Sequence, residues 1–417
     1  MNSRERVTLA LNHKEPDRIP VDLGGTIVTS ITKSAYLDLK RYLGMPVEES
    51  APAKGAGLRP VNNTGLRPAN NTGLRPANNA GLRMLDYVQQ LPYLDEALMQ
   101  RFSVDFRMVQ LPAATAPGLD ITEEGDYYAF IDRWGSKLHM PKDGGLYFDW
   151  VEFPIKEATL SALDAYCWPQ PDPIAYQVQL GQQARQLYET TDWALVGSAV
   201  IGGGIFEQPA RTMGLPDFLM ALVSEPAFAD RMMDQITDIY IESCNRYLDQ
   251  VGPYIQVFTF WDDVCGQDSW LIRPDLYRRM IKPKQRRLVE AIRKKTDAKL
   301  FYHSCGATFD LIPDLIDLGF DILNPVQVSA RGMATRRLKA VFGKDIVFWG
   351  GGVDTQQVLP FGTPQEVVEE VRRRIDDLAP GGGFVFAAVH NIQAFVPPQN
   401  VVAAFDAALE YGRYARR

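Results

Sequence analysis

The sequence predicts an α/β fold, a single closed (β/α)8 barrel (TIM barrel), and two observations support it. Short runs rich in β-branched and aromatic residues alternate with amphipathic helical stretches, which is typical of a parallel sheet covered by helices. The runs also number eight, as in a closed barrel. An open doubly wound sheet is the alternative. The predicted strands span residues 18–23, 106–111, 194–201, 255–260, 298–302, 322–326, 346–349 and 383–389.

Three amphipathic stretches between the later strands carry the end signals of helices. Residues 274–295, 308–318 and 364–378 each begin with Pro or Thr and end near a Gly or an Asp. Proline suits the first turn of a helix, where its missing amide hydrogen needs no partner, and glycine is favoured just past the end. These stretches are therefore predicted to be helices that connect parallel strands.

Two segments depart from this alternation within the barrel domain expected over residues 1–417. Residues 55–83 form a repeat with few apolar side chains to bury, which predicts a solvated, disordered loop without a function of its own. Residues 126–151 have hairpin character and predict a small β-excursion at the barrel mouth. The repeated tripeptide Gly-Leu-Arg starts every eight residues, at Gly57, Gly65, Gly73 and Gly81.

Composition indicates an ordinary globular protein and argues against several classes of partner. The 417 residues carry a net charge of −7, with 44 Lys and Arg against 51 Asp and Glu, whereas nucleic-acid and anionic-membrane surfaces are basic. The four cysteines lack the spacing of a disulfide framework, which favours a reducing compartment. No apolar stretch has membrane-spanning length and the start is unlike a signal peptide, so we expect a cytoplasmic protein.

Two of the four histidines, His303 and His390, lie at the ends of predicted strands, where a barrel carries its chemistry. Alternation along a strand directs His303 and Cys305 to the same side, and an imidazole beside a thiolate suits zinc. The alternative is that Cys305 is an inert buried thiol and His303 a hydrogen-bonded core residue. His13 and His139 are interpreted as surface residues.

Acidic residues also follow predicted strands. Asp262, Asp263 and Cys265 follow the fourth strand, and Glu207 follows the glycine-rich turn after the third. We predict that Asp263 and Glu207 are catalytic, since a strand-end carboxylate can act as a general acid or orient a metal-bound histidine. Asp262 or Asp263 could also supply a fourth zinc ligand. For the two aspartates the alternative is structural, because one of them could cap the next helix or pair with Arg273.

Four short motifs occur in one order along the chain. They are Arg18-Ile19-Pro20-Val21-Asp22, Trp261-Asp262-Asp263, Tyr302-His303-Ser304-Cys305-Gly306 and Gly351-Gly352-Val353-Asp354-Thr355. Together they resemble the uroporphyrinogen decarboxylase superfamily, and the resemblance extends from Arg4 to the C-terminus, excluding the repeat. It implies a (β/α)8 barrel. The superfamily holds at least two chemistries, so the site residues must decide the function.

Two features separate the branches of this superfamily. Decarboxylases carry an Arg-Gln-Ala-Gly-Arg segment after the first strand that grips the substrate's carboxylates, whereas residues 20–26 here contain no arginine. Corrinoid (cobalamin)-dependent methyltransferases bind zinc through a His-x-Cys pair and a cysteine near the end of the last strand. This chain keeps the pair as His303 and Cys305 and has His390 in place of that cysteine. These three residues are the zinc ligands that the resemblance implies.

The resemblance implies a zinc-dependent methyltransferase that moves a methyl group between methyl-cobalamin and a thiol or a methylated small molecule. The chain lacks the cobalamin-binding Asp-x-His-x-x-Gly motif, so the corrinoid is expected on a separate partner protein. A homodimer is a compatible assembly. One alternative is a metal-free decarboxylase of tetrapyrrole biosynthesis, in which Asp263 and His390 manage charge on a pyrrole. Another is a tetrapyrrole-binding barrel without chemistry.

Overall fold

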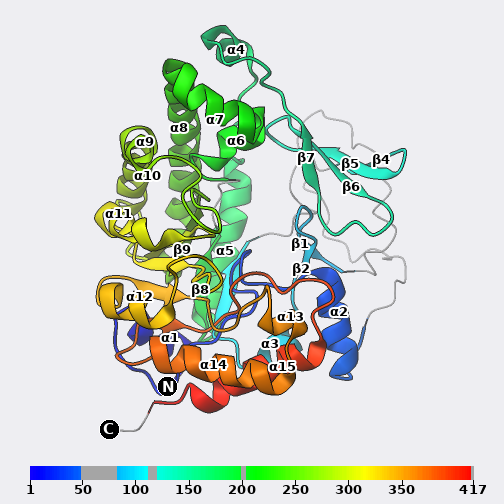
Figure 1. The fold of residues 1–417 in the computed structure, drawn as a ribbon, viewed down its shortest axis with the longest axis vertical. Helices are drawn as coiled ribbons and strands as arrows, with labels where there is room; N and C mark the ends of the chain where they lie inside the picture. Colours follow the sequence, from blue (N-terminus) through cyan, green and yellow to red (C-terminus); the bar gives the residue numbers. More distant parts are fainter. Residues whose placement is uncertain (48–81, 111–119, 199–202, 415–417) are drawn as a thin grey trace.

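Seven parallel strands form one curved sheet in the computed structural model, which describes residues 1–47, 82–110, 120–198 and 203–414 (Figure 1). The predicted repeat at 55–83 lies outside the described residues, apart from residues 82–83. The strand order is β13-β12-β11-β10-β9-β8-β3. The strands are β3 (Phe106–Val109), β8 (Ala194–Gly197), β9 (Val257–Trp261), β10 (Lys299–His303), β11 (Ile322–Asn324), β12 (Val347–Trp349) and β13 (Phe384–Val385).

The segment around Val21 closes this sheet into a barrel. Val21 forms a parallel bridge with Phe386, just after β13, and the Phe386 amide donates to the Pro20 carbonyl (2.9 Å). On its other side the Asp105 amide, just before β3, donates to the Val21 carbonyl (2.9 Å). The Val21 amide donates to the Asp105 carboxylate (2.9 Å) and not to a backbone carbonyl of β3. The predicted first strand is therefore present as an isolated bridge and not as a regular strand. The predicted closed (β/α)8 barrel is confirmed.

Alternate side chains of the strands fill the barrel interior. The Trp349 indole packs there against Phe106 and Phe301, with ring centroids 4.4 and 5.2 Å away. The neighbouring positions face outward and pack against the helices, as Phe348 and Leu300 do. Because helices cover the outside of a parallel sheet, the strands are buried on both faces, which explains their nearly continuous apolar runs.

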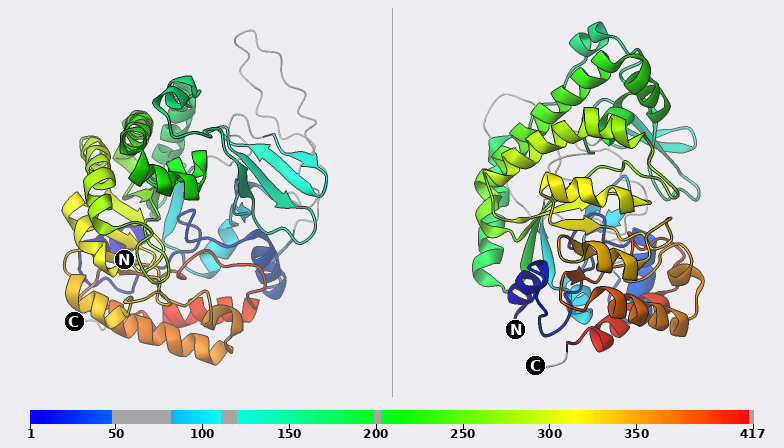
Figure 2. Two further views of the ribbon diagram at one scale, coloured as in Figure 1. Left: turned by 45° about the horizontal axis from the view of Figure 1, so that its top comes forward. Right: turned by 60° about the vertical axis from the view of Figure 1, so that its left-hand side comes forward.

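Helices surround the sheet (Figure 2). Helix α14 spans the predicted residues 364–378, because Thr363 and Glu366 form a capping box and Pro364 occupies the first turn. Within the described part of the chain, no helix combines the length and apolarity needed to cross a membrane. The helices are α1 (Ser3–Leu11), α2 (Lys33–Tyr42), α3 (Glu96–Arg101), α4 (Leu160–Ala165), α5 (Ile174–Thr190), α6 (Glu207–Met213), α7 (Leu215–Ser224), α8 (Pro226–Val251), α9 (Pro274–Leu276), α10 (Lys282–Arg293), α11 (Ile312–Leu318), α12 (Thr335–Phe342), α13 (Val358–Phe361), α14 (Pro364–Leu378) and α15 (Pro398–Tyr411).

A four-stranded antiparallel sheet lies beside the barrel, in the region where the sequence predicts a β-excursion (Figures 1 and 2). It has its own small core, in which Phe130 packs against Phe148. A two-stranded sheet of β1 (Met84–Asp86) and β2 (Leu91–Pro92) precedes it in the chain. The four strands are β4 (Thr122–Glu124), β5 (Tyr127–Ile131), β6 (Lys137–Pro141) and β7 (Asp149–Glu152).

Candidate metal centre

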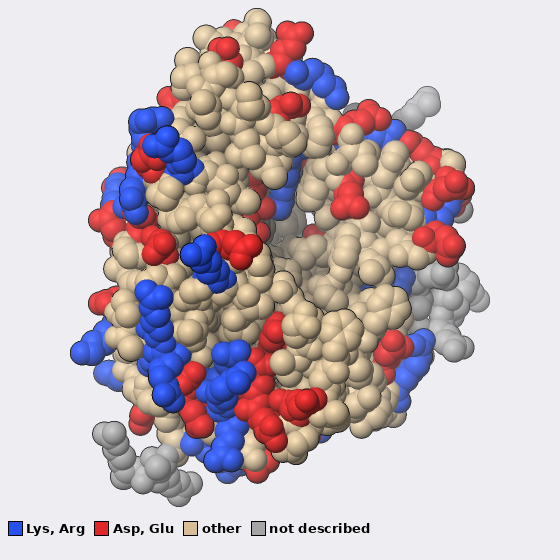
Figure 3. Space-filling view, viewed as in Figure 1, with Lys and Arg blue, Asp and Glu red and all other residues tan. Residues whose placement is uncertain are grey.

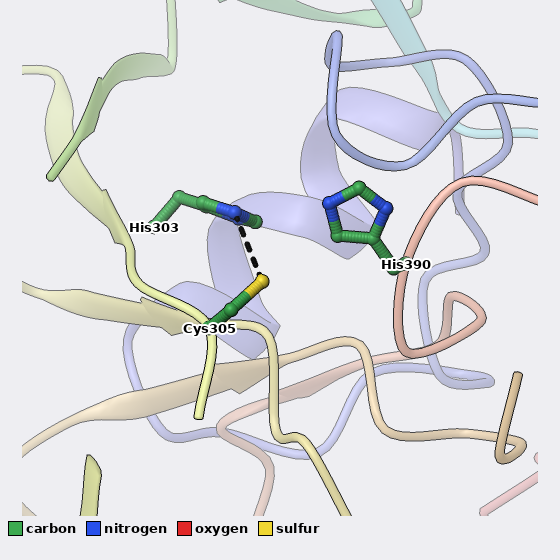
Figure 4. A group of neighbouring side chains, drawn as sticks. All are labelled: His303, Cys305 and His390. Atoms are coloured by element: carbon green, nitrogen blue, oxygen red, sulfur yellow. Dashed lines mark hydrogen bonds between the residues drawn. The ribbon is translucent and has the colours of Figure 1, made fainter. Parts of the chain in front are cut away.

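Three side chains with metal-binding atoms converge at the C-terminal ends of the barrel strands (Figure 4). One ligand atom from each of His303, Cys305 and His390 lies within 4.8 Å of the other two. His303 is the last residue of β10 and Cys305 follows on the same side, as alternation predicts, so that His303 Nε2 lies 3.5 Å from Cys305 Sγ. The structure thus brings together the three residues predicted as ligands.

His390 reaches this group because the chain after β13 stays paired with the extension of β12. The Gly352 amide donates to the Ala387 carbonyl (2.9 Å), and the Val389 amide donates to the Val353 carbonyl (3.1 Å). Regular pairing nevertheless ends earlier than predicted, so β13 is short and His390 lies in the loop that follows it.

The surroundings of the three donors keep them uncharged. Burial lowers the pKa of His303, and burial together with the neighbouring His303 lowers the pKa of His390 to about 3. Burial, reinforced by the charges of Asp263 and Glu207, raises the pKa of the Cys305 thiol. Neutral imidazoles and a cysteine sulfur are donors that zinc prefers, so these residues fit a zinc ion with one position left for a substrate. Metal binding would release the thiol proton.

Asp263 lies beside the three donors without being one of them. Its Oδ1 accepts a hydrogen bond from the Cys305 amide (2.8 Å) and lies 3.9 Å from His303 Nε2. Burial, reinforced by the charge of Glu207, raises the pKa of the Asp263 carboxyl to about 7. A carboxyl with this pKa can accept or release a proton near neutral pH, which suits a general acid or base.

Asp262, the preceding residue, lies in a different environment and is fully buried. Its carboxylate accepts hydrogen bonds of 3.0 Å from the backbone amides of Ile205, Phe206 and Glu207, where α6 begins. Gly204 permits this approach, because a Cβ there would lie 2.0 Å from the carboxyl carbon of Asp262. Asp262 therefore caps a helix, as a structural role predicts, but the helix is α6, which precedes it in the chain, and not the next helix as considered from the sequence.

Glu207 begins α6 and faces the same cavity as Asp263. Its carboxylate pairs with Arg211 one turn later (3.1 Å), and the Arg211 guanidinium lies over the Trp150 ring, 4.7 Å from its centroid. The cap at the start of α6 holds the backbone of Glu207 in place. The two residues predicted as catalytic thus line a cavity of about 540 Å³ that also reaches His303.

Several charged residues of this cavity were not predicted from the sequence. The surface is hollowed between the barrel and the β4–β7 sheet (Figure 3). The cavity is lined by three further carboxylates, Asp86, Asp132 and Asp172, and by the arginines Arg133 and Arg211. None of them directly follows a predicted strand, so no local signal marks them. The aromatic hairpin pattern marked only the segment that contains Asp132 and Arg133.

The remaining candidates serve the structure. Cys265 is buried, and burial raises the pKa of its thiol to about 12. Asp22 accepts a hydrogen bond from the Trp349 indole (2.9 Å). Arg273 pairs with Asp275 (2.9 Å), so its considered pairing with a strand-end aspartate is wrong. His13 and His139, interpreted from the sequence as surface residues, are both partly buried.

Comparisons with known proteins place the chain in a family. The profile of the family described as uroporphyrinogen decarboxylase (URO-D) matches residues 134–411. A uroporphyrinogen decarboxylase of Ralstonia pickettii is 25% identical over 57% of this chain, which spans 61% of that relative's length. One of Alkalilimnicola ehrlichii is 24% identical over 68% of this chain and 73% of its own.

A solved structure extends the likeness in fold to the whole chain. It is a methyltransferase from Methanosarcina mazei, which superposes with a TM-score of 0.60 at 15% identity and covers 99% of both chains. At this identity the likeness establishes the fold alone. Because the family profile covers more than half of the sequence, the protein belongs to the uroporphyrinogen decarboxylase family.

Proposed function

We propose that this protein is a zinc-dependent methyltransferase that moves a methyl group between methyl-cobalamin and a thiol or a methylated small molecule. The corrinoid would be supplied by a separate partner protein. The observation that carries the proposal is the convergence of one ligand atom each from His303, Cys305 and His390 within 4.8 Å. A methyltransferase from Methanosarcina mazei has the same fold, so this barrel is known to accommodate methyl transfer.

The three donors would hold the metal, and each has a neutral side chain suited to that task, with His303 buried and Cys305 and His390 half-buried. Zinc bound there would supply a Lewis acid that lowers the pKa of a substrate thiol. Asp263 would receive the proton released by that thiol, because its own pKa of about 7 lies near neutral pH. Its hydrogen bond with the Cys305 amide (2.8 Å) holds the carboxyl beside the site.

The charges in the cavity favour this reaction over decarboxylation of a tetrapyrrole. Arg133 and Arg211 are already paired with Asp172 and Glu207, each at 3.1 Å. Asp263 and two further carboxylates also line the cavity. A polyanionic tetrapyrrole would therefore meet more carboxyl groups than arginines, and no free arginine cluster among the described residues. A small thiol or methylated molecule needs no such cluster.

Metal analysis combined with a methyl-transfer assay tests the proposal. The purified chain should carry about one zinc, and it should convert methylcobalamin and dithiothreitol into the S-methylated thiol, cob(I)alamin and a proton. Chelation should abolish the activity, and added zinc should restore it. Release of carbon dioxide from uroporphyrinogen by metal-free protein, with no methyl transfer, would contradict the proposal.

A further inference from the structure

We infer that Asn324 is a positioning residue that decides which nitrogen of His303 faces the metal site. The inference rests on the proposed metal site and goes beyond its ligands. Asn324 ends β11 and pairs in register with His303 on the adjacent β10. Its side chain is fully buried, and its Oδ1 lies 2.6 Å from His303 Nδ1.

The direction of this hydrogen bond follows from a second bond on the other side of the amide. Asn324 Nδ2 lies 2.9 Å from the backbone carbonyl of Trp349, which can only accept a hydrogen bond. The amide nitrogen must therefore face Trp349 and the amide oxygen must face His303. Since an amide oxygen only accepts, the proton of the neutral imidazole resides on Nδ1. Nε2 then carries the lone pair and faces Cys305 Sγ at 3.5 Å.

The backbone is arranged to accommodate this amide. Gly350 has a φ of +89°, and a Cβ there would lie 3.1 Å from Asn324 Nδ2. The Asn324 carbonyl also accepts a hydrogen bond from the Ser304 amide (2.8 Å), between the two predicted ligands of the His-x-Cys pair. Asn324 thus holds the pair at two points, through its side chain and through its backbone.

The second histidine of the site lacks this arrangement. Among the residues that the structure describes, no hydrogen bond involves the ring nitrogens of His390. Burial keeps the His390 imidazole neutral but does not choose between its two tautomers. We therefore expect one tautomer for His303 and a mixture for His390. Ligand orientation by a group outside the first coordination sphere is worth about ten- to a hundred-fold in metal affinity.

Nitrogen NMR of the metal-free protein tests the tautomer directly. The chain has four histidines, so ¹⁵N-histidine labelling gives a simple spectrum, and His303→Gln identifies the signals of His303. In the wild type, Nδ1 of His303 should be protonated and Nε2 should not. A protonated Nε2 in the wild type would overturn the inference without the need for any variant at Asn324.

Variants of Asn324 test the consequence for metal binding. Asn324→Leu has a similar volume but no acceptor, so His303 should become a mixture of tautomers and the zinc affinity should fall about ten- to a hundred-fold. Asn324→Asp keeps an acceptor for Nδ1 and, with its buried carboxyl protonated, a donor for the Trp349 carbonyl, so it should retain the tautomer and an affinity close to that of the wild type. Competition with a chromogenic chelator measures the affinity.

A matched control separates positioning from general stability. Asn400 is another buried asparagine, whose amide nitrogen donates to the carbonyls of Leu359 (2.9 Å) and Gly362 (2.7 Å). Asn400→Leu should lower the melting temperature without changing the His303 tautomer or the zinc affinity. Equal losses of zinc affinity in Asn400→Leu and Asn324→Leu would overturn the inference, as would full affinity in folded Asn324→Leu.

The experiment also distinguishes this inference from the proposed function. If the wild type bound no zinc while His303 still carried its proton on Nδ1, the proposed metal chemistry would fail and the assigned role of Asn324 in orienting His303 would stand. If zinc bound tightly to protein with the other His303 tautomer, the proposed function would stand and the inference would fail.

Discussion

The two aspartates that follow strand β9 have contrasting surroundings. Asp262 is fully buried and accepts hydrogen bonds from three backbone amides and from Gln285 Nε2 (2.9 Å). Asp263 accepts one amide hydrogen bond, from Cys305, and otherwise lines the cavity. The first carboxylate is saturated by the protein itself, whereas the second retains acceptor positions for a substrate or a proton. Saturation by the protein therefore separates strand-end residues that stabilise the fold from those available for chemistry.

The largest expected effect is the loss of zinc when Cys305, which lies beside Asp263, is replaced. Cys305→Ala should abolish stoichiometric zinc binding, because it removes the one sulfur among the three donors. Metal analysis of the purified variant measures this. Cys265→Ala is the matched control, since it removes a buried thiol that does not belong to the donor group, and it should retain the metal. Full zinc occupancy in folded Cys305→Ala would show that the proposed ligand set is wrong.

The next effect concerns the exchange of one donor for another at His390. His390→Cys should still bind zinc, because a thiolate is an equally suitable ligand, whereas His390→Ala leaves two protein ligands and should weaken binding by orders of magnitude. Chelator competition compares the two affinities. Equal zinc affinity in His390→Cys and His390→Ala would show that His390 is not a ligand. The cavity side of the comparison would then depend on Asp263 and Cys305 alone.

Replacing each aspartate by alanine tests the contrast itself. Asp262→Ala leaves three buried amides without an acceptor and should lower the free energy of unfolding by about 3 kcal/mol or more. Asp263→Ala should cost less than about 1 kcal/mol but slow methyl transfer about 10²- to 10⁴-fold. Urea denaturation and the methyl-transfer assay measure these effects. Similar stability losses in both variants would contradict the division of roles.

Asp22 extends the comparison to a buried carboxyl that is saturated by Gly25, Thr29 and Trp349. Burial, with the charge of Asp105 adding to it, raises the pKa of Asp22 to about 6 from the ordinary 3.8. The folded state therefore binds the Asp22 proton more tightly than the unfolded state does. Protonation of Asp22 thus stabilises the fold, and this contribution is complete below pH 3.8 and is lost as the pH rises through 6.

The corresponding variant, Asp22→Asn, should show no such loss. Relative to the variant, the wild type should lose up to about 3 kcal/mol of unfolding free energy between acidic and neutral pH. Urea denaturation series at pH 4 to 7 measure the difference, with the interval set by the two pKa values. A constant difference between the two proteins across this range would show that Asp22 does not titrate there.

The smallest expected effect is that of deleting residues 57–80, which contain most of the repeat. The sequence predicts a solvated loop there, and loop length changes the folding free energy by only about 0.6 kcal/mol per doubling. Thermal melting and zinc content should therefore remain close to those of the full chain. A fall in the melting temperature of many degrees would indicate that the repeat packs against the barrel.

Much of the fold followed from local patterns. The eight predicted strands all correspond to a strand or bridge of the barrel, and α14 begins and ends as predicted because its capping box and proline are encoded in consecutive residues. The sequence could not show that β13 would be short, because the pairing of residues 387–389 depends on the glycine-rich extension of β12. It predicted Asp263 as the catalytic aspartate, but it could not show that Asp262 caps α6, because that contact joins residues 56 positions apart.

The sequence by itself determined the barrel and the same-side placement of His303 and Cys305, because strand count and side-chain alternation are properties of the local chain. Only the tertiary structure decided that His390 joins them and that Asn324 orients His303. It also decided that Asp262, which follows β9, caps the helix that follows β8. Each of these contacts joins residues that are far apart in the sequence. Their geometry depends on strand register and closure of the barrel, which no short stretch of sequence specifies.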